Sequence, residues 1–330
     1  FLTGEHMKFT ADDKLCCCVP LFHCFGVVLA TMNCLTHGCT QVMVERFDPL
    51  IVLASIHKER CTALYGVPTM FIAELHHPMF DLFDMSCLRT GIMAGSLCPV
   101  ELMKQVEEKM YMKVTSVYGL TEAAPGMTAT RIDDSFDVRC NTVGRDFEFT
   151  EVKVIDPETG EECPVGVQGE MCNRGYNTMK GYYKNPEATQ EVFTEDGWLR
   201  TGDLGTMDAS GNIFIRGRLK SMILSSSGQN IFPEELEAKL NNLPFILESL
   251  VIERNKKLVA LVYADYEALD SLGLNNPDNL KTIMDENLKN LNNNVAAYEK
   301  VSKIQLYPTE FEKTPKRSIK RYLYNSIAVD

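Results

Sequence analysis

The sequence predicts an α/β protein with a helix-covered, mostly parallel sheet, a β-rich barrel-like part and a small α+β domain at the C-terminal end. Over residues 15–118, short apolar strands alternate with helical segments, the pattern of parallel strands joined by helical crossovers. From about Asn141, glycines separate short β-rich pieces, which favours an antiparallel sheet or small barrel reaching to about Ile215. After Arg218, strands mixed with helices indicate a separate α+β unit.

Individual elements follow from apolar runs and from the residues that interrupt them. In the first part we expect strands over 15–20, 41–45, 63–67, 90–94 and 113–118, and helices over 26–35, 49–60, 68–75 and 99–109. The β-rich part contains a turn, Asp156-Pro157-Glu158-Thr159-Gly160, with proline early and glycine at its end. In the last part we expect helices over 233–240 and 279–291, strands over 250–254 and 258–264, and a polar linker at Asn292-Asn293-Asn294.

These elements predict two domains. The large domain covers residues 1–217 and is divided into an α/β part over 1–140 and a β-rich part over 141–217. The small domain covers 218–330, and we expect it to move about a hinge at Lys220.

Composition limits the possible functions. The 330 residues suffice for more than one domain, and 45% hydrophobic with 24% charged residues is ordinary for a globular protein. The net charge of −12 argues against a general nucleic-acid surface. The sequence contains no run of about 20 apolar residues that would predict a membrane span. No signal segment opens the chain, so we expect a cytoplasmic protein. Because Phe1 replaces an initiator methionine, we expect a fragment; the sequence does not indicate an oligomeric state.

Twelve cysteines raise the question of disulfides. Cys16-Cys17-Cys18 lie side by side on a strand-like run, and the others are scattered among apolar residues. A chain of this length does not need disulfide staples, and no Cys/His spacing matches a zinc site. We therefore expect buried free thiols.

Tyr118-Gly119-Leu120-Thr121-Glu122 is the segment that most strongly indicates a function. Tyr118 ends an expected strand, Gly119 permits a sharp turn, and ligands bind at strand ends in open α/β sheets. The Tyr118 ring can stack on a purine, Thr121 can donate to a phosphate oxygen, and Glu122 can bind Mg²⁺ through oxygen. By itself this segment also fits a tyrosine-capped turn with a surface glutamate.

Other segments supply the remaining groups of a nucleotide site. Asp203, in an expected turn after Trp198-Leu199-Arg200, can accept hydrogen bonds from both ribose hydroxyls, and Arg218 can donate to the same ribose. Gly95-Ser96 follows the strand over 90–94, where glycine lets backbone approach a ligand closely. Taken singly, each of these residues also fits an ordinary turn or a solvated side chain.

Five segments together resemble the adenylate-forming enzymes, a superfamily of acyl-CoA synthetases, luciferases and peptide-synthetase adenylation domains. They are Pro20–Gly26, Tyr118–Glu122, Gly175–Tyr183, Gly197–Gly205 and Gly217–Glu237. The sequence as a whole is similar to those of bacterial fatty-acyl-CoA synthetases. The resemblance implies that a carboxylate, expected to be a medium- or long-chain fatty acid, attacks the α-phosphate of ATP with Mg²⁺ present. The small domain then rotates, and a thiol, usually coenzyme A, takes the acyl group from acyl-AMP.

The resemblance also assigns roles to residues that spacing alone does not. It implies that His23 borders the acyl site, although a histidine beside an apolar run is more often a satisfied core residue. It makes Gly95-Ser96 the adenine-side wall, Lys220 the hinge, and Gly228 part of a loop facing the thiol. Ser225-Ser226-Ser227-Gly228 lacks the ending of a phosphate-binding Walker loop, so a tight hairpin is expected there.

The chain departs from this pattern in two ways. The family's Ser/Thr/Gly-rich loop, which ends Pro-Lys-Gly and holds the β- and γ-phosphates, is expected upstream of Phe1, so this chain alone should be inactive or impaired. At the C-terminal end, Ser318 stands where the family has its catalytic lysine, and Lys316 and Lys320 flank it. Either lysine is expected to supply the missing cation, which offsets charge as carboxylate and phosphate join.

Three functions remain open from the sequence. The first is an acid–CoA ligase. The second is a non-catalytic regulator that binds adenylate or acyl-CoA, which Ser318 favours. The third is an adenylating enzyme that delivers its acyl group to the phosphopantetheine of a carrier protein, or releases acyl-AMP.

Overall fold

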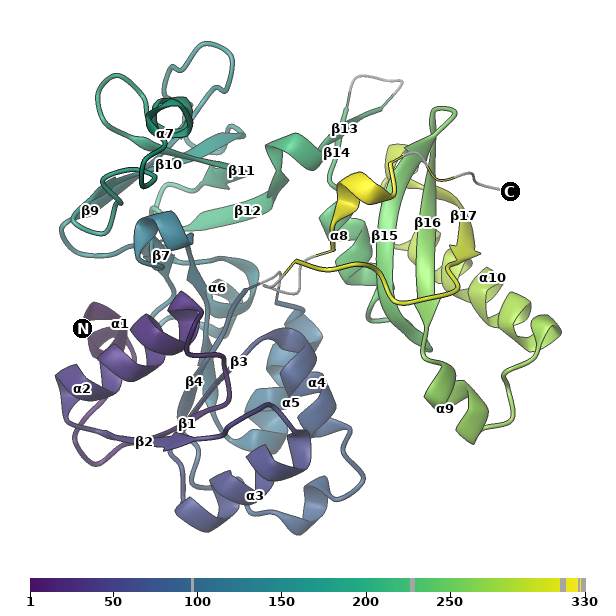
Figure 1. Cartoon of the computed structure of the whole chain (residues 1–330), viewed down its shortest axis with the longest axis horizontal. Helices are drawn as coiled ribbons and strands as arrows, with labels where there is room; N and C mark the ends of the chain where they lie inside the picture. The colour runs from purple at the N-terminus through teal and green to yellow at the C-terminus, as the bar shows by residue number, and fades with distance from the viewer. Residues whose placement is uncertain (96–97, 226–228, 315–318, 326, 328–330) are drawn as a thin grey trace. The chain divides into compact units, whose positions relative to one another are not determined.

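The computed structural model describes residues 1–95, 98–225, 229–314, 319–325 and 327. The chain divides into two compact units, Phe1–Ile215 and Arg216–Asp330. Figure 1 labels helices and strands of each unit, and its colour follows the chain from the N-terminus to the C-terminus. In the described part, no helix has the length and apolar character needed to cross a membrane. None of the twelve cysteines, all of which the structure describes, forms a disulfide; seven are buried and five are partly buried.

A five-stranded sheet in the order β2-β1-β3-β4-β5 organises the first unit. All its neighbouring strands are parallel, so the predicted parallel sheet is confirmed. The strands are β1 (Lys14–Cys17), β2 (Thr40–Met43), β3 (Ala63–Gly66), β4 (Thr90–Met93) and β5 (Lys113–Thr115). Every residue of β3 and β4 is buried, which explains why these strands are continuous apolar runs without alternation.

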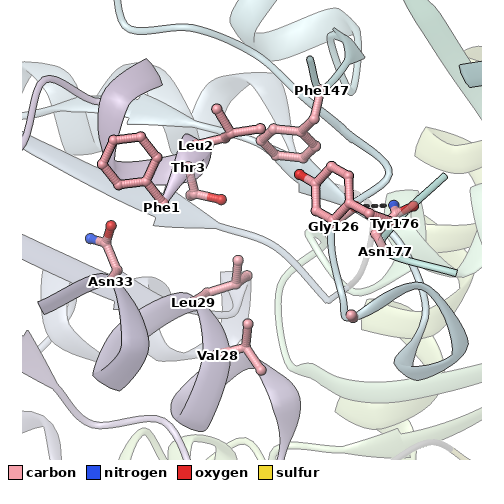
Figure 2. A pocket seen from close by; sticks show the side chains of 11 residues that line it. Phe1, Leu2, Thr3, Val28, Leu29, Asn33, Gly126, Phe147, Tyr176 and Asn177 are labelled. Carbon is pink, nitrogen blue, oxygen red and sulfur yellow. Dashed lines mark hydrogen bonds between the residues drawn. The ribbon is translucent and has the colours of Figure 1, made fainter. Parts of the chain in front are cut away.

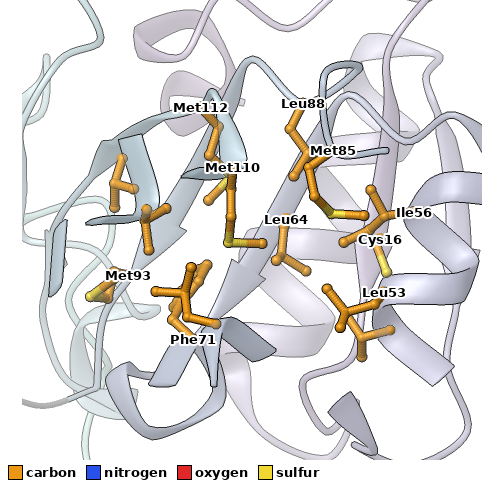
Figure 3. Packing of buried hydrophobic residues seen from close by; sticks show 14 of the residues in the cluster. Cys16, Leu53, Ile56, Leu64, Phe71, Met85, Leu88, Met93, Met110 and Met112 are labelled. Atoms are coloured by element: carbon orange, nitrogen blue, oxygen red, sulfur yellow. The ribbon is translucent and has the colours of Figure 1, made fainter. Parts of the chain in front are cut away.

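Helices cover both faces of this sheet because successive strand residues point to opposite sides. Cys16 belongs to the core on one face and Cys17 to the core on the other. Figure 3 shows the first of these cores, in which Leu53 and Phe71 pack around Leu64. The helices of this part are α1 (Leu2–His6), the π-helix η1 (Phe25–Met32), α2 (Asn33–His37), α3 (Pro49–Glu59), α4 (Pro68–Leu75), η2 (Phe80–Leu82), α5 (Val100–Met110) and α6 (Phe136–Asn141).

The single strand expected over 113–118 is wrong, because the chain leaves the parallel sheet at Ser116. The Ser116 backbone N–H donates to the Thr130 hydroxyl at 2.8 Å instead of continuing the ladder. Tyr118 therefore lies in a separate antiparallel sheet of order β6-β7-β8. Its strands are β6 (Val117–Tyr118), β7 (Thr128–Ala129) and β8 (Arg145–Asp146).

A second antiparallel sheet, in the order β12-β11-β10-β9, forms the rest of the β-rich part. Its strands and the associated helix are β9 (Thr150–Ile155), β10 (Gly169–Gly175), α7 (Pro186–Val192), β11 (Leu199–Met207) and β12 (Ile213–Arg218). The predicted turn after β9 is present: the Gly160 N–H donates to the Asp156 carbonyl at 2.9 Å, and Gly160 has φ +73°. Strand β12 runs across the division between the two units.

The second unit is the predicted α+β arrangement. Sheet β15-β16-β17 pairs antiparallel and then parallel, and it has an apolar core on each face, with Val251 in one and Leu250 in the other. A short hairpin precedes it. The elements are η4 (Leu219–Ser221), β13 (Ile223–Leu224), β14 (Asn230–Ile231), α8 (Pro233–Leu240), β15 (Ile246–Arg254), β16 (Lys257–Ala264), α9 (Tyr266–Ser271), α10 (Pro277–Asn293), η5 (Ala297–Glu299), β17 (Val301–Leu306) and η6 (Arg321–Leu323).

The expected polar linker at Asn292-Asn293-Asn294 is wrong, since α10 continues to Asn293. The Asn292 amide donates to the Val301 carbonyl at 2.8 Å and accepts from the Val301 N–H at 2.9 Å. This asparagine thus fixes the start of β17, a strand that the polar-apolar mixture of residues 301–306 did not reveal.

Candidate functional site

The loop over residues 119–126 closes on itself directly after Tyr118. The Met127 N–H donates to the Tyr118 carbonyl at 2.8 Å, which joins the two ends of the loop. An added Cβ at Gly119 would lie 1.8 Å from the Pro125 carbonyl oxygen. Glycine is therefore required at this position by close backbone contact. Within the loop, η3 (Thr121–Ala123) presents Thr121 to solvent and leaves Glu122 half-buried.

Tyr118 and Asp203 meet although 85 positions separate them: the Tyr118 hydroxyl donates to Asp203 Oδ2 at 2.7 Å. The expected turn at Asp203 is wrong, because this residue is buried within β11. The register against β10 shifts opposite this stretch, and Gly202 has φ +71°. The shift is a β-bulge, which re-aims side chains next to functional sites. Here the Asp203 N–H donates to the Thr201 hydroxyl at 3.0 Å.

Glu122 is held by a segment of the chain about sixty positions later. The Tyr182 hydroxyl donates to Glu122 Oε1 at 3.0 Å. The Met179 N–H donates to the Glu122 carbonyl at 2.8 Å. Burial raises the pKa of Tyr182, and the bond to Glu122 raises it further, so this hydroxyl stays protonated at neutral pH.

The His23 segment lies beside the same loop. Cys24 Sγ is 3.8 Å from Thr121 Oγ1, a contact between residues 97 positions apart. His23 Nδ1 accepts from the Phe25 N–H at 3.0 Å, so its ring is oriented by the start of η1. The structure therefore places His23, Tyr118, Thr121 and Asp203 in one part of the first unit.

The remaining predicted site residues belong to other elements or lie outside the described residues. Gly95 follows β4 with φ +91°, a conformation that favours glycine. Arg218 ends β12 and Lys220 lies in η4, both exposed and both in the second unit. Ser96, Gly228, Lys316 and Ser318 lie outside the described residues. The roles predicted for these residues, including the hinge at Lys220, stay predictions.

Lys320 is described, and it is engaged within the second unit. Its ammonium group lies 3.2 Å from Glu312 Oε2, and its N–H donates to the Glu312 carbonyl at 2.8 Å. Lys313 and Ile319 form an antiparallel bridge on either side of Lys316. Arg321, which follows Lys320, binds the carboxylates of Glu234 and Glu237.

A pocket of about 170 Å³ opens beside the loop in the first unit. Figure 2 shows Val28 and Leu29 of η1 on one side and Phe147, Tyr176 and Asn177 on another. Ala124 and Gly126 line it from the loop itself, and Phe1, Leu2, Thr3 and Asn33 line the rest. The dashed line in Figure 2 marks the Asn177 amide donating to the Gly126 carbonyl at 2.8 Å.

Sequence reasoning recognised the segment over 175–183 but gave Asn177 and Tyr182 no role. Asn177 is buried, and fully buried Asn173 donates to its Oδ1 at 3.1 Å. The available sequence signal was a pair of asparagines four residues apart with a glycine between them, while their burial is visible only in the structure. Such amides need internal partners when they are buried.

A second pocket, of about 260 Å³, lies in the second unit and carries positive charge. Lys256, Lys257 and Lys300 line it together with Tyr298 and one acid, Glu253. None of the three lysines forms an ion pair or hydrogen bond through its side chain within the part of the chain that the structure describes. Asn255 and Lys256 have φ of +49° and +61°, so Lys256 occupies a left-handed hairpin position where glycine is usual. Strained positions of this kind often mark functional sites.

The profile of the AMP-binding enzyme family matches residues 2–183, which contain the whole loop and the segment that holds it. The chain belongs to the AMP-binding enzyme family. The Bacillus subtilis (strain 168) protein YngI is 52% identical over 76% of this chain and 45% of its own length. The acyl-CoA ligase SID4 of Ajellomyces capsulatus is 46% identical over 76% of this chain and 43% of its own length. The chain thus spans less than half the length of these relatives.

Solved structures in this family share the fold. The ATP-bound MatB from Rhodopseudomonas palustris aligns over 98% of this chain and 62% of its own, at 26% identity and a TM-score of 0.80. The o-succinylbenzoate-CoA synthetase MenE of Bacillus subtilis, solved with an acyl-adenylate intermediate, aligns over 99% of this chain and 63% of its own at 24% identity, with a TM-score of 0.82. Both likenesses confirm the predicted fold class, including the small C-terminal unit.

Proposed function

We propose that this chain carries the nucleotide and acyl sites of an AMP-forming acid–CoA ligase. The observation that carries the proposal is the bond from Tyr118 to Asp203, which joins an aromatic ring and a buried carboxylate beside Thr121 and Glu122. A ring suits adenine and a carboxylate suits ribose hydroxyls, while the Thr121 hydroxyl suits a phosphate oxygen. Membership of the AMP-binding enzyme family supports this reading.

The proposed reaction has two steps. A carboxylate oxygen of the acid attacks the α-phosphorus of ATP, the bond to the β-phosphate breaks, and pyrophosphate leaves with acyl-AMP bound. A thiol sulfur then attacks the acyl carbon and expels AMP. In both steps, residues of the first unit would bind and orient the nucleotide. In the first step, a C-terminal lysine would offset the negative charge that develops as carboxylate and α-phosphate join.

The Glu122 carboxylate fits the Mg²⁺ that accompanies ATP. Oε1 accepts from Tyr182, while Oε2 makes no hydrogen bond or ion pair with a described residue. Over the same described residues, no group of three or more His, Cys, Asp or Glu side chains is placed to hold a metal. Mg²⁺ commonly uses one or two carboxylates together with substrate phosphates, so one glutamate suffices. When bound, the ion would neutralise phosphate charge.

For the acid, we propose a medium-length aliphatic chain. The pocket of about 170 Å³ is close to the size of cavities that hold a benzene ring, so it suits a chain of modest length. Val28, Leu29 and Phe147 make much of its lining apolar. A supporting comparison is the rat protein named medium-chain acyl-CoA ligase ACSF2, which is 38% identical over 76% of this chain.

For the thiol, we propose coenzyme A, because the lysine pocket of the second unit suits its phosphate groups. Lys256, Lys257 and Lys300 provide positive charge in a chain whose net charge is −12. A carrier-bound phosphopantetheine, which has a single phosphodiester, would need fewer cations. This difference favours coenzyme A over the carrier-protein alternative.

The test is product analysis with the full-length protein, medium-chain acids and Mg·ATP. Acyl-AMP is trapped with hydroxylamine, and pyrophosphate release is followed with and without coenzyme A. The proposal predicts acid-dependent pyrophosphate release and acyl-CoA formation. Adenylate formation without acyl transfer to coenzyme A would favour the carrier-protein reading, and binding without pyrophosphate release would favour the regulator.

A further inference from the structure

We infer that Tyr182 is a positioning residue that fixes the Glu122 carboxylate for the metal–nucleotide complex. The inference rests on the proposed function and assigns Glu122 a partner outside its own loop. The starting observation is the 3.0 Å bond from the Tyr182 hydroxyl to Glu122 Oε1. This bond joins residues 60 positions apart, so local sequence does not impose it.

The segment that carries Tyr182 also holds the backbone of Glu122. The Met179 N–H donates to the Glu122 carbonyl at 2.8 Å, and Asn177 donates to the Gly126 carbonyl at 2.8 Å. One segment therefore binds the loop at its main chain, at its far end and at the Glu122 side chain. Because the main chain of Glu122 is already fixed, the tyrosine bond restrains what remains free, the glutamate side chain.

Tyr182 itself is anchored through its backbone. Its N–H donates to the Thr189 hydroxyl of α7 at 2.9 Å. Gly181, with φ +140°, permits this contact, since an added Cβ would lie 2.7 Å from the Thr189 methyl group. The phenol therefore reaches Glu122 from a backbone held by a helix. A phenol held in this way restrains the orientation of the Glu122 carboxylate more tightly than solvent would.

The two oxygens of the Glu122 carboxylate therefore have different roles. Oε1 is occupied by the phenol, and Oε2 has no hydrogen bond or ion pair among the residues that the structure describes. A carboxylate that is already hydrogen-bonded through one oxygen, and presents the other to a cation, loses less conformational freedom on binding than an unrestrained carboxylate does. Outer partners of metal ligands commonly change metal affinity by about 10- to 100-fold. Tyr182 should therefore affect binding that requires the metal and leave metal-free binding unchanged.

The neighbouring residue gives a matched control. Tyr183 is 88% exposed, and its ring lies under Lys184. Tyr182→Phe and Tyr183→Phe each remove one hydroxyl and keep the ring. The measurement is calorimetric affinity of this chain for ATP with Mg²⁺ and with EDTA, together with AMP in EDTA and the thermal unfolding midpoint. Electron paramagnetic resonance of Mn²⁺, used in place of Mg²⁺, reports metal binding directly.

Mg²⁺ should raise the affinity of the wild-type protein for ATP, and in Tyr182→Phe we expect this gain to be about 10-fold smaller. Mn²⁺ binding should weaken by a similar factor. AMP affinity in EDTA and the unfolding midpoint should stay at the wild-type values, and Tyr183→Phe should match wild type throughout. An unchanged Mg²⁺ effect in Tyr182→Phe would overturn the inference, as would an equal loss of AMP affinity, which indicates a structural role. Wild-type protein that binds AMP but gains nothing from Mg²⁺ overturns this inference alone. Failure to bind AMP at all overturns the proposed function with it.

Discussion

The Tyr118 hydroxyl donates to Asp203 at 2.7 Å, so the aromatic ring and the carboxylate that were predicted to bind one nucleotide are in direct contact. Tyr118 belongs to the small sheet β6-β7-β8 and Asp203 to the larger antiparallel sheet. The bond therefore links two sheets of the first unit. It also fixes the orientation of both side chains, which reduces the entropy that ligand binding would cost.

Gly119→Ala should disrupt the loop that follows Tyr118. An added Cβ would lie 1.8 Å from the Pro125 carbonyl oxygen, and a backbone atom cannot move aside as a side chain can. We expect a loss of about 1–3 kcal/mol in the free energy of unfolding of the first unit, and weaker AMP binding. Urea unfolding and calorimetry measure both. In the control Gly66→Ala, the nearest atom is 3.2 Å away on the Phe71 ring, so its effect should be smaller. Equal effects in both variants would refute this explanation.

Replacing two lysines of the charged pocket should weaken coenzyme A binding selectively. In Lys257→Gln/Lys300→Gln, we expect the dissociation constant for coenzyme A to rise about 3- to 10-fold, the scale of two exposed charge contacts. Wild-type protein should bind 3′-dephospho-coenzyme A about as weakly, and AMP affinity should not change. Lys281→Gln/Lys289→Gln, on the exposed side of α10, is the control. If both double variants lower affinity equally, the effect reflects overall charge.

Glu74→Gln should flatten the dependence of stability on pH. Glu74 is 1% exposed, and burial raises its pKa well above 4.5, so the folded chain holds a proton that the unfolded chain releases. From about pH 4.5 upward, the unfolding free energy should therefore fall by up to about 1.4 kcal/mol per pH unit until the folded pKa is passed. Urea unfolding at pH 5.5 and pH 8 should show a smaller decrease in Glu74→Gln. The exposed Glu108→Gln should behave as wild type, and a wild-type slope in Glu74→Gln would contradict the argument.

The two lysines that flank Ser318 should contribute unequally to adenylation. Lys320 lies 3.2 Å from Glu312, and this pairing occupies its ammonium group. We therefore expect Lys316→Ala in the full-length protein to slow acyl-AMP formation by about 10²-fold, the scale of one lost preorganised charge contact. Lys320→Ala should slow it less. Hydroxylamine trapping measures both rates, and active enzyme with neither rate reduced would mean that the charge comes from elsewhere.

The sequence predicted the parallel sheet well because its central strands β3 and β4 are buried on both faces and are short, largely apolar runs between helical segments. It failed at Ser116, where a hydroxyl from Thr130, 14 positions away, takes the next backbone bond. Asp203 was placed in a turn because Gly202 suggested one, whereas the glycine serves a bulge inside β11. Motif spacing selected Tyr118 and Asp203, which the structure brings into contact, but their role toward a nucleotide stays a prediction. Tyr182 and Asn177 were missed because they contact residues 60 and 51 positions away, which periodicity does not encode.

The proposed function requires this chain to bind an adenosine nucleotide with Asp203 on the ribose. The most direct measurement is calorimetric affinity for AMP and for 2′,3′-dideoxy-AMP, in wild type, Asp203→Asn and the control Asp196→Asn, whose carboxylate bonds to Thr194 in an exposed turn. An asparagine at 203 can still accept the Tyr118 bond, so the variant changes charge with little change in packing. Wild type and Asp196→Asn should prefer AMP by about 10-fold or more, and Asp203→Asn should lose most of that preference. Equal affinity of wild type for the two nucleotides, or an unchanged preference in Asp203→Asn, would contradict the account.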